Sequence, residues 1–136
     1  GHGRGKQHGS IVGDVILKGR KEFWSKPKLH YHHALRAGEN TLNLQCLRVL
    51  LRSSIPDYSA DRFLDSYIDF MTTADSHQDT YAESFHRDFF ANWNNGKPAK
   101  NCAGAEDHNT ASVGGLVLLP PVLIKSIKKN FCGHNN

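Results

Sequence analysis

Apolar side chains recur at helical spacing in the middle of the chain. From Thr41 to about Ser54 they follow the three-and-four spacing that lines one face of a helix. The expected buried face consists of Leu44, Leu47, Leu50, Leu51 and Ile55. Pro56 and Asp57 are typical of the end of such a segment. The pattern therefore predicts an amphipathic helix over this stretch.

Two more helices are predicted downstream. One follows Ser59, a residue type that commonly caps helices. Its apolar stripe is Phe63, Leu64, Tyr67, Ile68 and Met71. The other runs from Gln78 to about Asn95 and ends at Gly96 and Pro98. Its inner face is Ala82, Phe85, Phe89 and Trp93. A last helix is expected to open at Asn109-Thr110 and to break at Pro120-Pro121.

The segment from Ser10 to Leu17 is apolar, and its length fits either a short buried helix or a strand. Asp14 is the one charge within it, and a buried carboxylate needs a partner. Asp14 therefore either forms a local hydrogen bond or faces a site. Residues 18–36 show no period and read as loop, and no stretch alternates clearly as a strand does. The fold class that follows is all-α, a compact helical domain.

Three polar stretches stand at or near the start of predicted helices, and each pairs an Asn or Asp with a Thr. They are Glu39-Asn40-Thr41, Gln78-Asp79-Thr80 and His108-Asn109-Thr110. Capping a helix N–H stabilises it by about 1 kcal/mol, which would explain these residues without a function. Carboxylate and amide oxygens at converging helix ends also make a Mg²⁺ or Ca²⁺ site. These three stretches are thus only caps, or together they line one site, and residues 107–110 include Asp107 beside the third.

Composition excludes several classes of protein. The chain has 136 residues, enough for one domain, and a net charge of +4. Its Lys and Arg residues form no basic face interleaved with aromatics, so we expect no nucleic-acid partner. No apolar run reaches the roughly 18 residues of a membrane span. Three widely spaced cysteines without a CxxC pair indicate reduced thiols and a cytoplasmic protein.

Two further features have simple interpretations. His30-Tyr31-His32-His33 attracts attention as a metal cluster, but adjacent side chains point in different directions, which favours three partly exposed polar rings. Residues 1–8 are glycine-rich and basic, as in a flexible leader, and residues 9–136 form the expected domain. A chain that begins with Gly and ends in a polar tail is typical of a fragment. The sequence does not give the oligomeric state.

The order of several short motifs resembles the N-terminal half of the ADP-ribosylglycohydrolase family, which includes the J1 crystallins. Residues 9–15, Gly-Ser-Ile-Val-Gly-Asp-Val, resemble its opening motif small-x-x-x-Gly-Asp-Ala. Residues 38–43, Gly-Glu-Asn-Thr-Leu-Asn, resemble Thr-Asp-Asp-Thr-x-Met and the helix that follows. Residues 58–71, 92–98 and 107–120 resemble its next helix, its Gly-x-Pro-Pro turn and its Asn-Gly-Asn loop with a proline-containing helix. The resemblance covers most of residues 9–124.

This resemblance implies an all-α fold with two Mg²⁺ ions that hydrolyses the bond between C1″ of ADP-ribose and an acceptor side chain. By position, the metal ligands are Glu39, Asn40 and Thr41, and the catalytic carboxylates are Glu39 and Asp107. The residues expected near the ADP-ribose are Asp14, His108, Asn109 and Thr110. The expected partner is ADP-ribose or an ADP-ribosylated substrate.

The departures from the family pattern leave alternatives open. Glu39-Asn40 stands where the family has Asp-Asp, so one acid is lost. Residues 107–110 also resemble the family's C-terminal motif Asp-x-Asp-Thr/Ser, again with one acid missing. A second hypothesis is therefore a non-catalytic relative, either a crystallin-like structural protein or an ADP-ribose binder. A third is an unrelated helical interaction domain whose three polar stretches are caps only.

Overall fold

The computed structural model describes residues 11–24 and 26–103. The elements in this part are α1 (Lys21–Trp24), α2 (Leu42–Ser53), α3 (Ala60–Thr72), α4 (Ser84–Asn94) and a short 3₁₀ helix, η1 (Ala99–Asn101). The β-structure found in these residues is a single isolated bridge between Val12 and Ile16. The predicted all-α character is confirmed for the described part of the chain.

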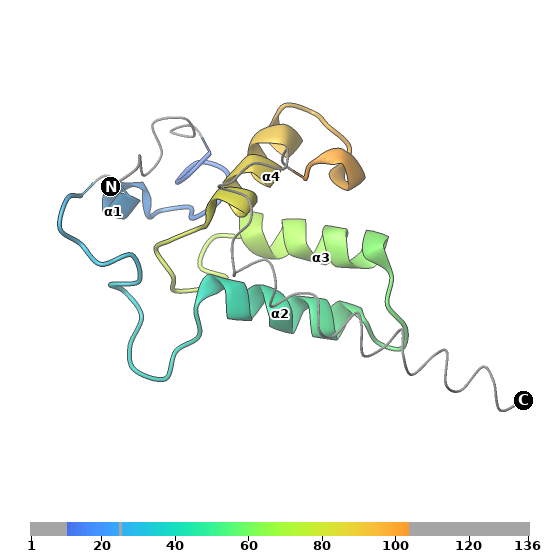
Figure 1. Cartoon of the computed structure of the whole chain (residues 1–136), viewed down its shortest axis with the longest axis horizontal. Helices are drawn as coiled ribbons and strands as arrows, with labels where there is room; N and C mark the ends of the chain where they lie inside the picture. The colour runs from blue at the N-terminus through green and yellow to red at the C-terminus, as the bar shows by residue number, and fades with distance from the viewer. Residues whose placement is uncertain (1–10, 25, 104–136) are drawn as a thin grey trace, which may run out of the picture.

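The helices α2 and α3 lie side by side (Figure 1), and α4 packs on α3 through aromatic rings. Aromatic rings fill the space between α3 and α4. The ring centroid of Tyr67 is 5.1 Å from that of Phe89 and 5.3 Å from that of Phe90. Such edge-on and tilted contacts stabilise a core beyond the area they bury. Residues 11–17 and Trp24 complete the same core.

The predicted bounds of α2 and α3 agree with the structure to within about a residue. The prediction that Ser59 caps α3 is confirmed, because its hydroxyl oxygen accepts a hydrogen bond from the Arg62 N–H at 3.3 Å. The predicted stripe of α3 also faces the core, with Tyr67 and Met71 fully buried. The helix α4 begins at Ser84 rather than Gln78, because residues 77–83 form a loop whose polar groups bind elsewhere.

The buried face predicted for α2 is mostly wrong. Leu50 is buried as expected, but Leu44 is 40% exposed, Leu51 45% and Ile55 71%. The core-facing side is instead formed by Leu42, Cys46 and Leu50, four residues apart. Leucines occur on both sides of this helix, so spacing alone did not show which side faces α3. Burial raises the pKa of the Cys46 thiol to about 12, which keeps it protonated.

Residues 11–17 form neither of the elements predicted from their length. They make a tight apolar turn in which the Val15 and Ile16 N–H groups donate to the Ile11 carbonyl at 2.9 and 3.1 Å. Gly13 sits in the left-handed region at φ +95° and donates to the Ile16 carbonyl at 2.7 Å. A Cβ there would lie 2.4 Å from Lys21 Cβ, so only glycine fits.

We expect Gly13→Ala to lower the free energy of unfolding by about 2–4 kcal/mol, because backbone strain and a steric clash add. Gly19→Ala is the matched control: Gly19 has φ +77°, but a methyl group added there would meet no atom within 4 Å. Gly19→Ala should lower the free energy of unfolding by about 1 kcal/mol, because only the strain of the left-handed backbone is added. Urea unfolding of both variants measures the difference, and equal losses would contradict the clash.

Candidate functional site

Asp79 is a fully buried carboxylate that joins the loop before α4 to the start of α2. Its Oδ2 accepts a hydrogen bond at 2.8 Å from the N–H of Leu42, the first residue of α2. Its Oδ1 accepts from the N–H groups of Thr80 and Tyr81 at 2.8 and 3.2 Å. Thr41, at the N-cap position, makes no side-chain capping bond. Asp79 therefore caps a helix 37 residues away in sequence, not its own helix.

A histidine and an arginine side chain donate hydrogen bonds to Asp79. His32 Nδ1 lies 2.7 Å from Asp79 Oδ1, and since a carboxylate oxygen accepts, this nitrogen carries the proton. Arg20 Nη1 donates to the main-chain carbonyl of Asp79 at 2.8 Å. A buried carboxylate without such partners would be strongly destabilising. The loop 77–83 is consequently fixed against both α2 and residues 20–33.

Two histidines of residues 30–33 form hydrogen bonds with residues of the loop 77–83. His32 binds Asp79, and His33 Nδ1 lies 3.2 Å from the hydroxyl of Thr80, which donates its own proton to the Tyr31 carbonyl. Within residues 11–24 and 26–103, no group of three His, Cys, Asp or Glu side chains could hold a metal ion. The interpretation of these residues as partly exposed polar rings agrees with this geometry.

A chain of buried hydrogen bonds reaches the start of α2 from the core. The Tyr67 hydroxyl lies 2.6 Å from His86 Nδ1, and His86 Nε2 lies 3.0 Å from Asn43 Oδ1. Asn43 Nδ2 donates to Glu83 Oε1. Every donor has an acceptor if His86 is neutral and carries its proton on Nε2. Burial, helped by the nearby positive charge of Arg87, lowers the pKa of His86 to about 3.

The polar stretches at residues 39–41 and 78–80 meet at a small cavity of about 80 Å³. The side chains that line it are His32, Thr41, Leu42, Asn43, Asp79, Tyr81 and Glu83. The Tyr81 ring stacks on Trp24, with centroids 5.6 Å apart and planes 12° from parallel, so α1 supports this wall. The structure thus brings together two of the three polar stretches that the sequence singled out. The third, at residues 107–110, lies outside the described residues.

The predicted site residues are placed unequally around this cavity. Thr41 lines it, whereas Asn40 is partly buried and is not part of the lining. Glu39 is exposed and accepts a hydrogen bond from the Arg36 N–H at 2.9 Å, which closes its own turn. Asp14 is exposed and forms an ion pair with Lys21 at 3.0 Å, the local alternative for this residue. Asp107, His108, Asn109 and Thr110 lie outside the described residues.

The described residues do not by themselves fit a Mg²⁺ site. Both oxygens of Asp79 are occupied by N–H donors, and a carboxylate so engaged has little capacity left for a cation. The carboxylate of Glu39 faces its own turn. Magnesium in proteins is bound by one or two carboxylates with several waters. A complete ligand set would require acids beyond this part of the chain.

The sequence interpretation missed several residues that the structure places at the site. Glu83 occupies the N-cap position of α4, yet its carboxylate makes no capping bond and instead meets Asn43. The spacing predicts Tyr67 only as part of an apolar stripe, and it predicts no role for His86. A signal was available: Glu83 and His86 are three residues apart on one helix face, within an otherwise aromatic segment. Their partner Asn43 could not be found from local spacing.

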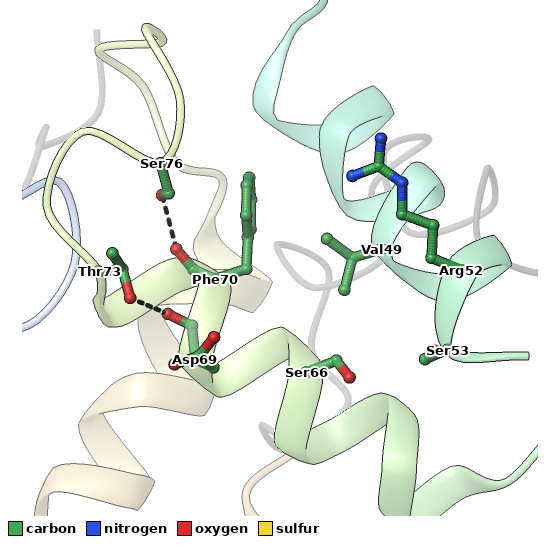
Figure 2. A pocket seen from close by; sticks show the side chains of 8 residues that line it. All are labelled: Val49, Arg52, Ser53, Ser66, Asp69, Phe70, Thr73 and Ser76. Carbon is green, nitrogen blue, oxygen red and sulfur yellow. Dashed lines mark hydrogen bonds between the residues drawn. The ribbon is translucent and has the colours of Figure 1, made fainter.

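A larger cleft of about 440 Å³ lies between α2 and α3, away from these residues (Figure 2). Val49 and Arg52 form one wall, and Asp69, Phe70 and Thr73 form the other. Its hydroxyls complete the end of α3: Thr73 donates to the Asp69 carbonyl at 2.6 Å, and Ser76 donates to the Phe70 carbonyl at 2.6 Å. None of the predicted site residues lines it, and these two hydroxyls serve the helix end.

Comparison with protein-family models, with curated proteins and with solved structures finds no match to this chain. Among the described residues, no helix is both long enough and apolar enough to cross a membrane.

The buried histidines make stability depend on pH. His86 has a folded-state pKa of about 3 and His77 one of about 4, both lowered mainly by burial, against 6.5 for the free side chain. At a pH between each folded-state pKa and 6.5, the unfolded chain binds a proton that the folded chain does not. The free energy of unfolding therefore falls as the pH drops below about 6.5. Each histidine should contribute a loss of about 2 kcal/mol between pH 7 and pH 5.

Urea unfolding at pH 7 and pH 5 measures this loss, and we expect His86→Gln to reduce it by about 2 kcal/mol. His77→Gln should remove a similar share, which makes it a matched control for a second buried ring. If the loss between the two pH values were the same in both variants as in the parent protein, the neutral state of these rings would be contradicted.

Proposed function

We propose that this chain is an ADP-ribosylglycohydrolase-like protein that receives ADP-ribose at the start of α2. One observation carries the proposal: two Asx-Thr stretches, at residues 39–41 and 78–80, converge on one polar cavity through the Asp79–Leu42 hydrogen bond. The proposed reaction is Mg²⁺-dependent hydrolysis of the bond between ADP-ribose and an acceptor side chain. The all-α character of the described part agrees with the proposal.

The residues of this chain supply hydrogen-bonding groups suited to a sugar. Glu83 and Asn43 line the cavity with a carboxylate and an amide, and Thr41 adds a hydroxyl. Carboxylate and amide oxygens accept hydrogen bonds from vicinal hydroxyls such as those of a ribose. The Tyr67–His86 pair behind Asn43 fixes the direction of its amide group. The cavity is small, so it would hold the hydroxyl edge of a ribose and not the whole nucleotide.

Residues 39–41, together with acids outside the described residues, would hold Mg²⁺, which would supply Lewis-acid activation of a water, and a carboxylate would act as general base. Glu39 and Asp107 are the proposed catalytic carboxylates, and Glu39, Asn40 and Thr41 the proposed metal ligands. Asp14, His108, Asn109 and Thr110 are proposed to contact the ligand. The buried free thiols of Cys46 and Cys102 support a cytoplasmic setting as part of the same proposal.

A second candidate function is a non-catalytic ADP-ribose binder or a crystallin-like structural protein. The engagement of Asp79 favours it, because both carboxylate oxygens accept hydrogen bonds from the protein itself. The turn of Glu39 back to the Arg36 N–H favours it as well. A binder needs only the sugar-facing groups of the cavity, and a structural protein needs neither ligand nor metal.

Hydrolysis of an ADP-ribosylated protein, measured with and without Mg²⁺, tests the catalytic proposal. We expect Glu39→Ala and Asp107→Ala to lower the rate about 100-fold or more, as loss of a catalytic carboxylate does. Glu83→Gln should weaken binding of ADP-ribose by about tenfold, because a charged acceptor is lost. Glu22→Ala is the control: this exposed glutamate pairs with Lys26 at 3.6 Å and does not line the cavity.

Calorimetry with ADP-ribose separates the remaining outcomes. Binding that Glu83→Gln weakens, without hydrolysis, identifies the non-catalytic binder. Hydrolysis that persists unchanged in both Glu39→Ala and Asp107→Ala would overturn the site assignment. If the protein neither hydrolyses nor binds ADP-ribose, the two functional candidates fail and a structural or interaction role remains.

A further inference from the structure

The cleft between α2 and α3 has a volume of about 440 Å³, several times that of the cavity beside Asp79. Cavities that hold small molecules in proteins measure roughly 300–1,000 Å³. They combine apolar walls with a few polar groups that fix the orientation of the ligand. By its size, this cleft fits a small organic molecule.

Apolar side chains from the two helices face each other across the cleft. Val49 on α2 points toward Phe70 on α3 (Figure 2). Both side chains are only partly buried. The Phe70 ring is supported by His77, whose ring centroid lies 5.7 Å from its own. An apolar body placed between Val49 and Phe70 would remove their remaining exposed surface from water, which is favourable.

Three of the hydroxyls that line the cleft are already engaged. Ser53, Thr73 and Ser76 donate to main-chain carbonyls at 3.0, 2.6 and 2.6 Å. Two further polar side chains on its walls carry charge, and one more carries a hydroxyl. Within residues 11–24 and 26–103, the side chains of these three residues form no hydrogen bond or ion pair. They are Arg52, Ser66 and Asp69.

The two charges stand on opposite walls. Arg52 projects from α2 and Asp69 from α3, and both residues are exposed (Figure 2). A guanidinium group donates two parallel hydrogen bonds to a carboxylate, so the α2 wall suits an anionic group. A carboxylate such as that of Asp69 accepts from an ammonium group. The cleft therefore presents complementary charges to a molecule that carries both signs.

The position of Asp69 on its helix also favours a cation beside it. Asp69 lies in the last turn of α3, and this turn contains no basic residue. The C-terminal end of a helix carries a partial negative charge, so a carboxylate is unfavourable there and a positive group is stabilising. A ligand ammonium next to Asp69 would offset both the carboxylate and the helix dipole.

The apolar residues set the form of such a ligand. Val49 and Phe70 lie between Arg52 and Asp69 (Figure 2). Packed helices have axes about 8–10 Å apart, so a ligand that meets both walls must carry its charges at the two ends of an apolar body. A molecule charged at one end would leave the other wall without a partner.

We propose that this cleft binds a small aliphatic zwitterion. Its carboxylate pairs with Arg52, its ammonium group pairs with Asp69, and its hydrocarbon body lies between Val49 and Phe70. The inference does not depend on the proposed function, because the cleft and the cavity beside Asp79 share no lining residue.

Three probes with the same hydrocarbon body test this site in the full chain. The probe 6-aminohexanoate carries both charges, hexanoate carries the negative one and hexylamine the positive one. Amide shifts of Val49, Ser66 and Phe70 in ¹⁵N-labelled protein report binding in the cleft. We expect 6-aminohexanoate to bind about threefold more tightly than either other probe, the size of effect that one exposed charge pair produces. Equal affinities for the three probes, or no shifts at these residues, would overturn the proposal.

Two variants that each remove one charge assign the walls. Arg52→Gln should weaken 6-aminohexanoate and hexanoate about threefold without weakening hexylamine. Asp69→Asn should weaken 6-aminohexanoate and hexylamine without weakening hexanoate. Both residues are exposed, so the variants should fold, and urea unfolding checks this.

Asp61→Asn is the matched control, because Asp61 is an exposed aspartate of α3 that does not line the cleft. We expect it to leave the affinity for all three probes unchanged. If Asp61→Asn weakened binding as much as Asp69→Asn, net charge would explain the affinity and the proposal would fail. Unchanged affinities in both Arg52→Gln and Asp69→Asn would overturn it as well.

Discussion

The hydrogen bond from the Leu42 N–H to the buried carboxylate of Asp79 organises the described part of this protein. The first N–H groups of a helix have no partner within it, and a negative charge there is favoured by the helix dipole. Asp79 supplies both an acceptor and a charge, from a loop that also binds residues 20–33. This contact joins the start of α2 to the loop 77–83, and the cavity lies beside it.

The buried hydrogen bonds of Tyr67, His86 and Asn43 have a different role from the Asp79–Leu42 contact. Tyr67 and His86 connect the aromatic core between α3 and α4 to Asn43 in the first turn of α2. A neutral histidine with one donor and one acceptor nitrogen joins a hydroxyl to an amide, which fixes the orientation of both. The amide nitrogen of Asn43 consequently faces Glu83, and the carboxylate of Glu83 lines the cavity. Core packing and cavity chemistry are therefore coupled through a single imidazole.

Local sequence signals predicted the helices but not the site. The periodicity of residues 41–54 and the cap at Ser59 depend on neighbours within one turn, and both helices formed as predicted. The contact between Asp79 and Leu42 joins residues far apart, and nothing in the spacing of residues 78–81 distinguishes a cap of their own helix from a cap of another. Likewise, Leu44 and Leu50 have the same periodicity, and only the position of α3 decides which is buried.

Amide hydrogen exchange of Leu42 in the full chain tests the central role of Asp79 most directly. The N–H of the first residue of a helix normally exchanges rapidly, since it lacks a partner. Because Asp79 is buried and accepts from it, we expect the Leu42 amide to exchange only on global unfolding, and Asp79→Asn to raise its rate about 100-fold or more. Rapid exchange of the Leu42 amide in the parent protein would contradict this account.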